Sequence, residues 1–201
     1  MTGNRDLRSI AANLQAGGAG IVQYRDKVSP MGVIVNNAAR LTGVGVPLIM
    51  NDYPEIAKRV GALGVHLGQN DMDIEEARKI IGNDKIVGGS THSIKEAQQA
   101  EQQGADYIGI GPVFATTTKK GVLPVGTDIL RQVAAVIKIP VFAIGGINLD
   151  NLDMVLSTGI RKVAVGKGVL DSEDIKSAVN AFCRRINHES DNMGEEKKTV
   201  A

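Results

Sequence analysis

Short apolar runs rich in valine and isoleucine recur along the chain, and helix-patterned segments separate them. The runs are mostly unbroken and do not alternate with polar residues, which is typical of strands buried on both faces of a parallel sheet. They repeat at intervals of about 20 to 25 residues, which indicates successive βα units. The predicted strands cover residues 20–25, 46–52, 64–68, 85–90, 107–112, 141–146 and 162–169.

Amphipathic segments with recognisable caps lie between these runs. Ser93 is followed three residues later by Glu96, which is a capping-box pattern, and Gly104 follows as a natural C-cap. Asp71 and Asp73 precede another segment as N-cap candidates. The predicted helices in this part of the chain cover residues 74–81, 93–103, 127–138, 148–157 and 172–186.

The number of strands favours an α/β fold of the TIM (β/α)8 barrel type, which commonly forms one domain. The chain opens with a helix pattern over residues 6–16, and residues 1–5 are too few and too polar for a strand. We therefore predict a barrel without its first strand, which leaves two unpaired edges. The barrel domain is predicted over 1–186, and 187–201 is so polar that we predict a disordered tail.

Composition excludes several classes of protein. Lysine plus arginine number 23 and aspartate plus glutamate 22, so the chain lacks the basic excess of a nucleic-acid-binding domain. The lone Cys183 excludes an intrachain disulfide and favours a reducing compartment. No signal peptide is evident, and no apolar run reaches the roughly 18 residues of a membrane span. We expect a cytoplasmic protein with neither membrane nor nucleic-acid partners. The sequence leaves open whether the protein forms a homo-oligomer.

Polar side chains follow the first two predicted strands. Strand alternation places Gln23, Arg25 and Lys27 on one side, where two cations and an amide can receive an anion such as a diphosphate. A solvated charge cluster is the plainer interpretation, but polar residues inside an apolar strand are costly unless they are used. The next strand ends at Asn51 and Asp52.

Further chemistry-bearing residues follow the middle strands. Asp71 follows the third strand, and together with Asp52 it can hold a hard cation whose remaining ligands are phosphate oxygens, although capping alone also accounts for each aspartate. Ser90 follows two glycines and can bond a ligand oxygen. His92 is a candidate general base, but a wall position is the commoner role, and His66 within a strand is expected in the core or behind the site.

The later loops suggest anion binding. Residues 116–120 combine three threonines with two lysines, which can grip a phosphate, although a plain polar loop has the same composition. The last two strands end near Gly146 and near Gly166 and Lys167. Phosphate sites in such barrels are commonly built from the loops after the last two strands, where glycines leave backbone amides open.

Taken in order, the segments QYRDK, ND, GVHLGQND, GGSTH, GADYIGIGPVFATTTKK and AIGGIN resemble the motifs of the thiamine phosphate synthase family. The likeness covers about residues 17–183, and the GADYIGIGPVF segment followed by TTTK is its most specific part. The resemblance implies a transferase of thiamine biosynthesis that condenses a pyrimidine diphosphate with a thiazole phosphate and uses Mg²⁺.

The resemblance also implies a role for each matching residue. Asp52 and Asp71 would hold Mg²⁺, and Arg25, Lys27 and Lys119 would stabilise the departing diphosphate. The implied substrate-binding residues are Gln23, Tyr24, Arg25, Asp26, Lys27, Asn51, Ser90, Thr116, Thr117, Thr118, Lys119, Gly146, Gly166 and Lys167. The implied reaction is dissociative: diphosphate leaves, and the thiazole nitrogen attacks the resulting carbocation. It needs no protein nucleophile, and no Ser/His/Asp triad or reactive cysteine is evident in the sequence.

Two departures from the family pattern keep other interpretations open. The family has an additional first strand, and its last strand is followed by an apolar residue and a serine where this chain has Gly166 and Lys167. The alternatives are a thiazole tautomerase-like relative, a non-catalytic barrel that binds a phosphorylated ligand, and another phosphate-handling barrel such as an epimerase or an aldolase. An aldolase would need a Schiff-base lysine, for which Lys27 is the candidate at a strand end.

Overall fold

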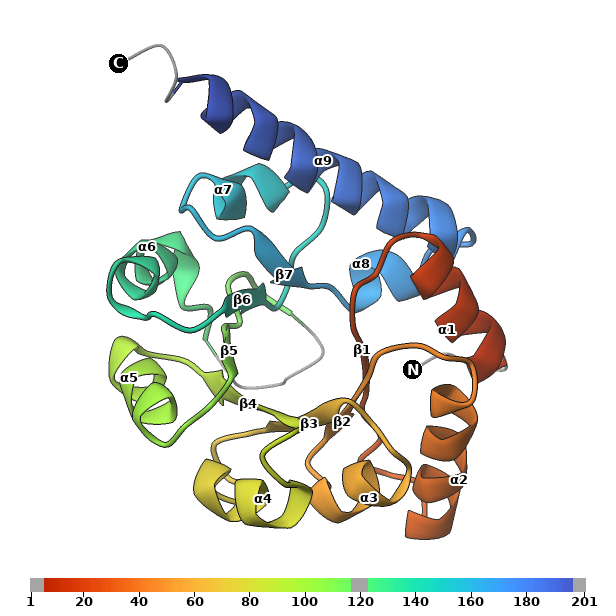
Figure 1. Cartoon of the computed structure of the whole chain (residues 1–201). Helices are drawn as coiled ribbons and strands as arrows, with labels where there is room; N and C mark the ends of the chain where they lie inside the picture. The colour runs from red at the N-terminus through yellow and green to blue at the C-terminus, as the bar shows by residue number, and fades with distance from the viewer. Residues whose placement is uncertain (1–5, 117–122, 197–201) are drawn as a thin grey trace.

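The computed structural model describes residues 6–116 and 123–196, with side chains as far as residue 188. Over these ranges seven parallel strands form one sheet in chain order (Figure 1). They are β1 (Val22–Tyr24), β2 (Leu48–Asn51), β3 (Gly64–Leu67), β4 (Ile86–Thr91), β5 (Tyr107–Ile110), β6 (Val141–Ile144) and β7 (Lys162–Ala164). Figure 1 shows the strands curving around a common interior, with the helices on the outside.

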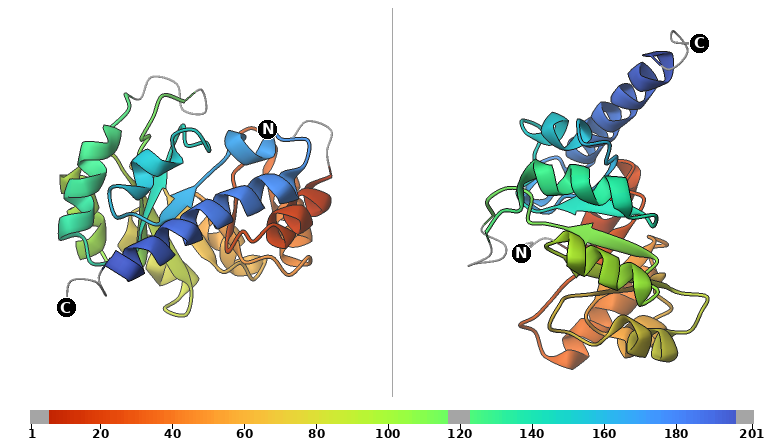
Figure 2. Two further views of the ribbon diagram at one scale, coloured as in Figure 1. Left: turned by 90° about the horizontal axis from the view of Figure 1, so that it is seen from above. Right: turned by 90° about the vertical axis from the view of Figure 1, so that its left-hand side faces the viewer.

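Helices connect successive strands and cover the outer face of the sheet. They are α1 (Leu7–Ala16), α2 (Met31–Thr42), α3 (Pro54–Arg59), α4 (Ile74–Ile81), α5 (Ile94–Gln102), α6 (Gly126–Val136), α7 (Leu152–Leu156), α8 (Lys167–Leu170) and α9 (Ile175–Glu196). In the right-hand view of Figure 2, α9 extends beyond the rest of the molecule, and its first part is in contact with α1.

The sheet is an open half-barrel within the described residues, because β1 and β7 are its two edges and do not pair with each other. Seven parallel strands with intervening helices confirm the predicted fold class. The single domain over 1–186 stays a prediction. No helix in the described parts of the chain is long and apolar enough to span a membrane.

The core lies between the outer face of the sheet and the helices. Strand residues such as Met50, Val65, Val87 and Ile108 are completely or almost completely buried there. They pack in one cluster with helix residues that include Ile34, Ala57, Ala77, Ala97, Leu130 and Leu152. Full burial of one large apolar side chain contributes about 1.5–3 kcal/mol, so this layer holds the strands in place.

Local signals start several helices where the sequence predicts them. The Asp6 carboxylate accepts a hydrogen bond from the Ser9 amide and caps α1. The Ser93 hydroxyl accepts one from the Glu96 amide at α5, as the capping-box pattern predicts. The Glu96 carboxylate in turn accepts from the amide of His92, one residue before the cap.

Two predicted segments differ from the structure near the C-terminus. The apolar run over 162–169 is not one strand, because β7 ends at Ala164 and α8 begins at Lys167. Helix α9 continues to Glu196, so residues 187–196 are helical where we predicted a disordered tail. Extending an existing helix costs far less than starting one, and Phe182 anchors the first part of α9 in the core.

Arg78 of α4 ties the amino-terminal ends of two neighbouring strands together. Its guanidinium donates to the carbonyls of Lys85 and Gly104, which precede β4 and β5, and to the carboxylate of Asp106. That carboxylate also accepts a hydrogen bond of 2.7 Å from the Val87 amide. One partly buried arginine therefore satisfies polar groups from several segments.

We predict that Arg78→Ala lowers the free energy of unfolding by about 2 kcal/mol, because it leaves carbonyls and a carboxylate without their charged donor. The matched control is Arg131→Ala, which removes an exposed ion pair with Asp128 and should cost less than about 0.5 kcal/mol. Urea denaturation of both variants measures the difference. Equal losses would contradict the structural role of Arg78.

Candidate active site at the carboxyl ends of the strands

The register of the sheet decides which side chains share its inner face. Asn51 stands beside His66 on the neighbouring strand, and Gln23 stands beside Ile49, two residues before Asn51. Residues two apart on a strand point to the same face. The contact of His66 with Ser90 adds a fourth strand to this group. Gln23, Asn51 and Ser90, three of the predicted binding residues, therefore face one interior.

A cluster of opposite charges lies where β1, β2 and β3 end. The Lys27 ammonium lies 2.7 Å from Asp52 Oδ2 and 3.8 Å from Asp71 Oδ1. The Asp52 side chain is 11% exposed and that of Asp71 24%, whereas Lys27 is 44% exposed. The structure thus brings together the two aspartates predicted as metal ligands and one predicted diphosphate contact.

Local backbone structure holds both aspartates. Asp52 has a φ of 73°, in the left-handed region that aspartate tolerates better than most residues, and its amide donates to the His66 carbonyl. Asp71 Oδ2 accepts a hydrogen bond of 2.8 Å from the Gly68 amide. Asp73, not Asp71, occupies the N-cap position of α4. The capping interpretation therefore does not account for Asp71.

The electrostatics of the cluster favour a positive charge. Burial raises the pKa of Asp52 above its usual value, the hydrogen bond from Lys27 lowers it, and the nearby Asp71 raises it again. Two partly buried carboxylates in contact repel each other, and a cation between them relieves that repulsion. In this structure Lys27 supplies that cation.

The alternate side chains of the QYRDK segment do not share one face of a strand. Strand β1 ends at Tyr24, so strand alternation does not extend to Arg25 or Lys27. Arg25 is exposed and forms no ion pair with any described residue. Its guanidinium is therefore available at the same end of the sheet as Lys27.

Tyr24 and Asp26 face other partners. Tyr24 is buried on the opposite side of β1 from Gln23, and its hydroxyl accepts from the Asn37 amide of α2 and donates to Asp26. The other oxygen of Asp26 accepts from the amides of Val28 and Ser29. These contacts order the turn after β1 and engage both side chains. The structure therefore does not place Tyr24 and Asp26, two predicted substrate-binding residues, among the inner-face residues.

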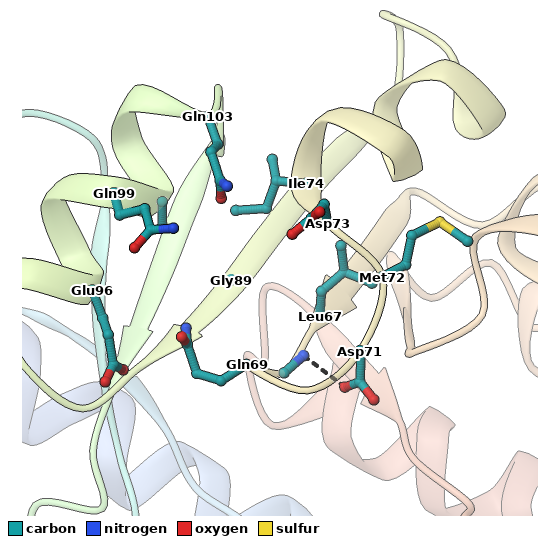
Figure 3. A pocket seen from close by; sticks show the side chains of 12 residues that line it. Leu67, Gln69, Asp71, Met72, Asp73, Ile74, Gly89, Glu96, Gln99 and Gln103 are labelled. Atoms are coloured by element: carbon teal, nitrogen blue, oxygen red, sulfur yellow. Dashed lines mark hydrogen bonds between the residues drawn. The ribbon is translucent and has the colours of Figure 1, made fainter.

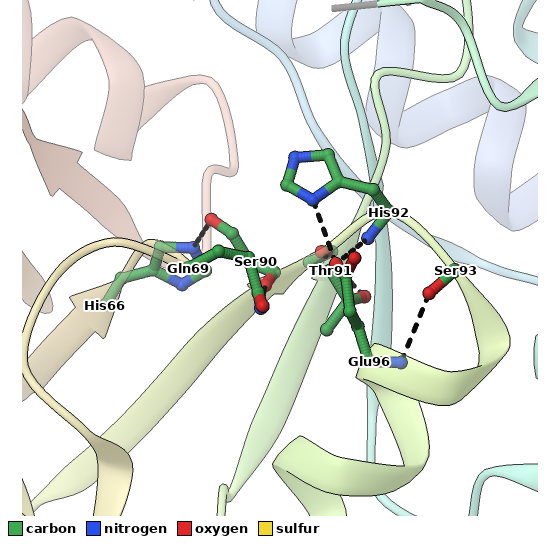
Figure 4. Close-up of polar contacts among 8 residues, drawn as sticks. His66, Gln69, Ser90, Thr91, His92, Ser93 and Glu96 are labelled. Atoms are coloured by element: carbon green, nitrogen blue, oxygen red, sulfur yellow. Dashed lines mark hydrogen bonds and ion pairs between the residues drawn. The ribbon is translucent and has the colours of Figure 1, made fainter.

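A polar network crosses the inner face between β3, β4 and β5. His66 Nε2 lies 2.8 Å from Ser90 Oγ, and His66 Nδ1 lies 2.9 Å from the Tyr107 hydroxyl. Figure 4 shows His66 and Ser90 side by side, with Gln69 close to them. Sequence reasoning missed Tyr107, because its place at the start of an apolar strand carries no polar signal. Only the strand register brings it beside His66.

His92 has a structural partner. Its Nδ1 lies 3.0 Å from Glu96 Oε2, and the same carboxylate oxygen accepts from the His92 amide (Figure 4). Both contacts belong to the start of α5. The candidate general base is therefore tied to a helix cap, as the wall interpretation predicted.

Gly146, a predicted phosphate contact, lies in a tight turn after β6. Its φ is 68°, and a Cβ there would lie 2.6 Å from the Ala115 carbonyl oxygen, so only glycine fits. The Asn151 amide bonds the Gly146 carbonyl. The Gly146 N–H donates to no backbone carbonyl of the described residues. Among the described residues the Gly146 amide therefore has no backbone acceptor, and its turn lies beside the segment that leads to Thr116.

The predicted phosphate loop is only partly described. Thr116 lies at its start and is half-buried. Thr117, Thr118 and Lys119 lie outside the described residues, and their roles stay predictions. Gly166 is the N-cap residue of α8 and Lys167 its first residue, so both sit at a helix start immediately after β7.

Lys162 is a further inner-face residue that sequence reasoning missed. It pairs with Phe142, whose register partner Gly109 packs against His66. The lysine therefore faces the interior from the edge strand β7. A charged residue that points inward from an edge strand also discourages edge-to-edge association.

A small cavity of about 90 Å³ lies beside this region, between the β3–α4 loop and α5. Figure 3 shows Gln69 and Asp71 on one side of it and Gln99 and Gln103 on the other. It opens outside the ring of strands and does not include Lys27 or Asp52. Among the described residues, no group of three or more His, Cys, Asp or Glu side chains is placed to hold a metal ion.

Comparison with known proteins shows the family of this chain. The family model described as thiamine monophosphate synthase matches residues 1–169. The chain belongs to the thiamine monophosphate synthase family. It is 43% identical to a thiamine-phosphate synthase of Halalkalibacterium halodurans over 184 residues, 89% of this chain and 87% of that protein. It is 44% identical to one from Clostridium botulinum over 181 residues, 88% of each.

A solved structure agrees with these relatives. A thiamine phosphate pyrophosphorylase from Pyrococcus furiosus superposes with a TM-score of 0.83 at 34% identity, over 92% of this chain and 91% of that one. The predicted family, fold class and enzyme class are thereby confirmed, and this member of the thiamine monophosphate synthase family is a transferase of thiamine biosynthesis. The roles of individual site residues stay predictions.

We predict that Lys27→Met raises the pKa of Asp52 further, because the variant removes the ammonium that opposes the effects of burial and Asp71. Titration of the aspartate carboxyl carbons by NMR, in buffer without divalent cations, measures the shift. Arg25→Met is the matched control, because Arg25 pairs with neither carboxylate. The same pKa in wild type and Lys27→Met would contradict the ion-pair assignment.

Proposed function

We propose that this chain condenses 4-amino-2-methyl-5-(diphosphooxymethyl)pyrimidine with 4-methyl-5-(2-phosphoethyl)thiazole to give thiamine phosphate and diphosphate. The observation that carries the proposal is the convergence of Lys27, Asp52 and Asp71 at three neighbouring strand ends. This charge cluster borders an inner face with amide, hydroxyl and imidazole groups. A diphosphate and a nitrogen heterocycle need these two kinds of surroundings side by side.

The reaction breaks one bond and forms another on the same carbon. The methylene C–O bond breaks, and the diphosphate leaves with the electron pair. The aminopyrimidine stabilises the resulting carbocation, and the thiazole nitrogen then donates its lone pair to form the C–N bond. Such a step needs charge stabilisation on the leaving group, which we assign to Arg25, Lys27 and Lys119. It needs no protein nucleophile.

The carboxylate pair suits Mg²⁺. Magnesium is usually held by one or two carboxylates together with substrate phosphates and water, and Asp52 and Asp71 supply two carboxylates that already converge on a shared cation. We propose these two residues as its protein ligands. When bound, the metal would add positive charge beside the leaving diphosphate. That donor set needs no third protein ligand.

The carboxyl ends of β6 and β7, across the interior from β1–β3, suit the thiazole phosphate. The Gly146 amide, which has no backbone acceptor among the described residues, follows β6 and lies next to the chain segment that reaches Thr116. Gly166 and Lys167 follow the end of β7, and we assign the phosphate contact to these groups together with Thr116 and Thr118. With the diphosphate at β1–β3, this placement holds the two reactants together across one interior, which lowers the entropic part of the barrier.

We predict Mg²⁺-dependent formation of thiamine phosphate from the two substrates. Asp52→Ala should lower kcat/KM by about 100-fold or more, because it removes one of two carboxylates proposed to hold the metal. Asp73→Ala, which removes an exposed carboxylate outside the charge cluster, is the matched control and should retain the rate. Substrate binding without product would favour a non-catalytic phosphate-binding barrel and would sink the proposed reaction.

Arg25→Ala should lower kcat by about 100- to 1000-fold, the range measured when one preorganised donor to a developing anion is lost. Arg8→Ala removes an exposed arginine from α1, away from the strand ends, and serves as the control for charge alone. Steady-state kinetics with both substrates measures the two variants. A wild-type kcat in Arg25→Ala would exclude Arg25 from diphosphate stabilisation.

A further inference from the structure

The turn between β1 and α2 carries Lys27 into the charge cluster. Asp26 Oδ1 accepts hydrogen bonds from the amides of Val28 and Ser29, at 3.1 and 3.0 Å. An aspartate that bonds its own backbone in this way forms an Asx-turn, and Lys27 is the residue next to Asp26 that this turn encloses. Val28 is 93% exposed, so packing of its side chain does not hold the turn. The Asp26 carboxylate therefore fixes the backbone of Lys27.

The same carboxylate is tied to the sheet. Its other oxygen accepts a hydrogen bond of 3.3 Å from the Tyr24 hydroxyl, and that hydroxyl accepts one of 3.2 Å from the Asn37 side chain on α2. Tyr24 is buried and pairs with Met50, a completely buried residue of β2. Hydrogen bonds, with that from the Ser29 amide as the largest effect, lower the pKa of Asp26, so its carboxylate is an acceptor at both oxygens. The turn is thereby joined to the buried pairing of β1 with β2.

These contacts form a path from the buried sheet to the ammonium of Lys27. That ammonium lies 2.7 Å from Asp52 Oδ2 and 3.8 Å from Asp71 Oδ1. A lysine side chain has large rotamer freedom, so a fixed backbone reduces what must still be ordered when it meets an anion. A displacement of about 1 Å at a catalytic group can lower a rate by about 100-fold. The turn thus controls a distance on which the reaction depends.

We propose that Asp26, held by Tyr24, is a positioning residue that places the Lys27 ammonium against the leaving diphosphate. The inference rests on the proposed function, because that function assigns Lys27 to the diphosphate. It replaces the substrate contact that the QYRDK motif implies for Asp26 and Tyr24, since both side chains are already engaged within the protein. A carboxylate in direct contact with a diphosphate would also repel it.

Glu101 offers a matched control at the other end of the sheet. Its Oε1 accepts hydrogen bonds from the amides of Lys138 and Ile139, at 2.8 and 3.1 Å. These amides precede β6, whereas Asp26 follows β1. Loss of either carboxylate removes two hydrogen bonds to the backbone. Only the loss of Asp26 should reach the reaction.

Two substitutions of Asp26 separate positioning from charge, with steady-state kinetics as the readout and the melting temperature as a fold control. Asp26→Ala removes the amide bonds and should lower kcat/KM about 50-fold, because Lys27 is displaced. Asp26→Asn keeps a carbonyl oxygen for the two amides and should lose no more than about 5-fold. Glu101→Ala should retain the wild-type rate. Equal losses in the two Asp26 variants, or an equal loss in Glu101→Ala, would overturn the proposal.

A double-mutant cycle tests whether Asp26 acts through Lys27. In the Lys27→Met background, Asp26→Ala should add less than about 3-fold, because the group that it positions is already absent. Independent effects that multiply would contradict the assignment. Tyr24→Phe keeps the ring and serves if Asp26→Ala does not fold. It should cost about 5-fold in the wild type, as expected for one hydrogen bond, and nothing further in Lys27→Met.

The position of the lysine can be read without any substrate. A crystal structure of Asp26→Ala should show Lys27 Nζ beyond the ion-pair distance of about 4 Å from Asp52, whereas Asp26→Asn should keep the contact. An unmoved Lys27 in Asp26→Ala would refute the positioning role. If the wild type forms no thiamine phosphate, the proposed function fails, whereas these structures still decide whether Asp26 holds Lys27.

Discussion

The parallel register of the sheet is the constraint on which the rest of the molecule depends. Each strand pairs in the same direction with its neighbour in the chain, so all strand ends that carry polar residues lie at one edge. Lys27, Asp52 and Asp71 meet there although each follows a different strand. The buried apolar layer beneath the helices keeps this register, and a slip of one residue would turn the inner face outward.

The inner face is unusually polar for a barrel, whose interior is commonly filled by layers of branched apolar side chains. His66, Tyr107 and Ser90 stand in that interior, and a buried polar group is costly unless it is bonded. These three satisfy one another, and Gly88 leaves the space that the Tyr107 ring needs.

Much of the fold and part of the site follow from sequence patterns. The seven apolar runs predict every strand, and the 74–81 pattern predicts α4 to the residue. The pairing of Asp52 with Asp71 follows from their places after adjacent strands. The end of β7 does not follow, because the run over 162–169 stays apolar while the backbone turns into α8. The length of α9 does not follow from the sequence pattern either, because a polar segment can continue a helix whose first part is held by packing.

The sequence by itself determined the alternation of strands and helices, the capping box that starts α5, and the kinds of chemical groups at each strand end. These properties are local, since they depend on periodicity and on neighbours three or four residues away. Only the tertiary structure decided that Tyr24 points toward α2 while Gln23 faces the interior, and that Tyr107 meets His66. Such contacts join residues far apart in the chain, and they depend on where β1 ends and how strands register, which no local pattern specifies.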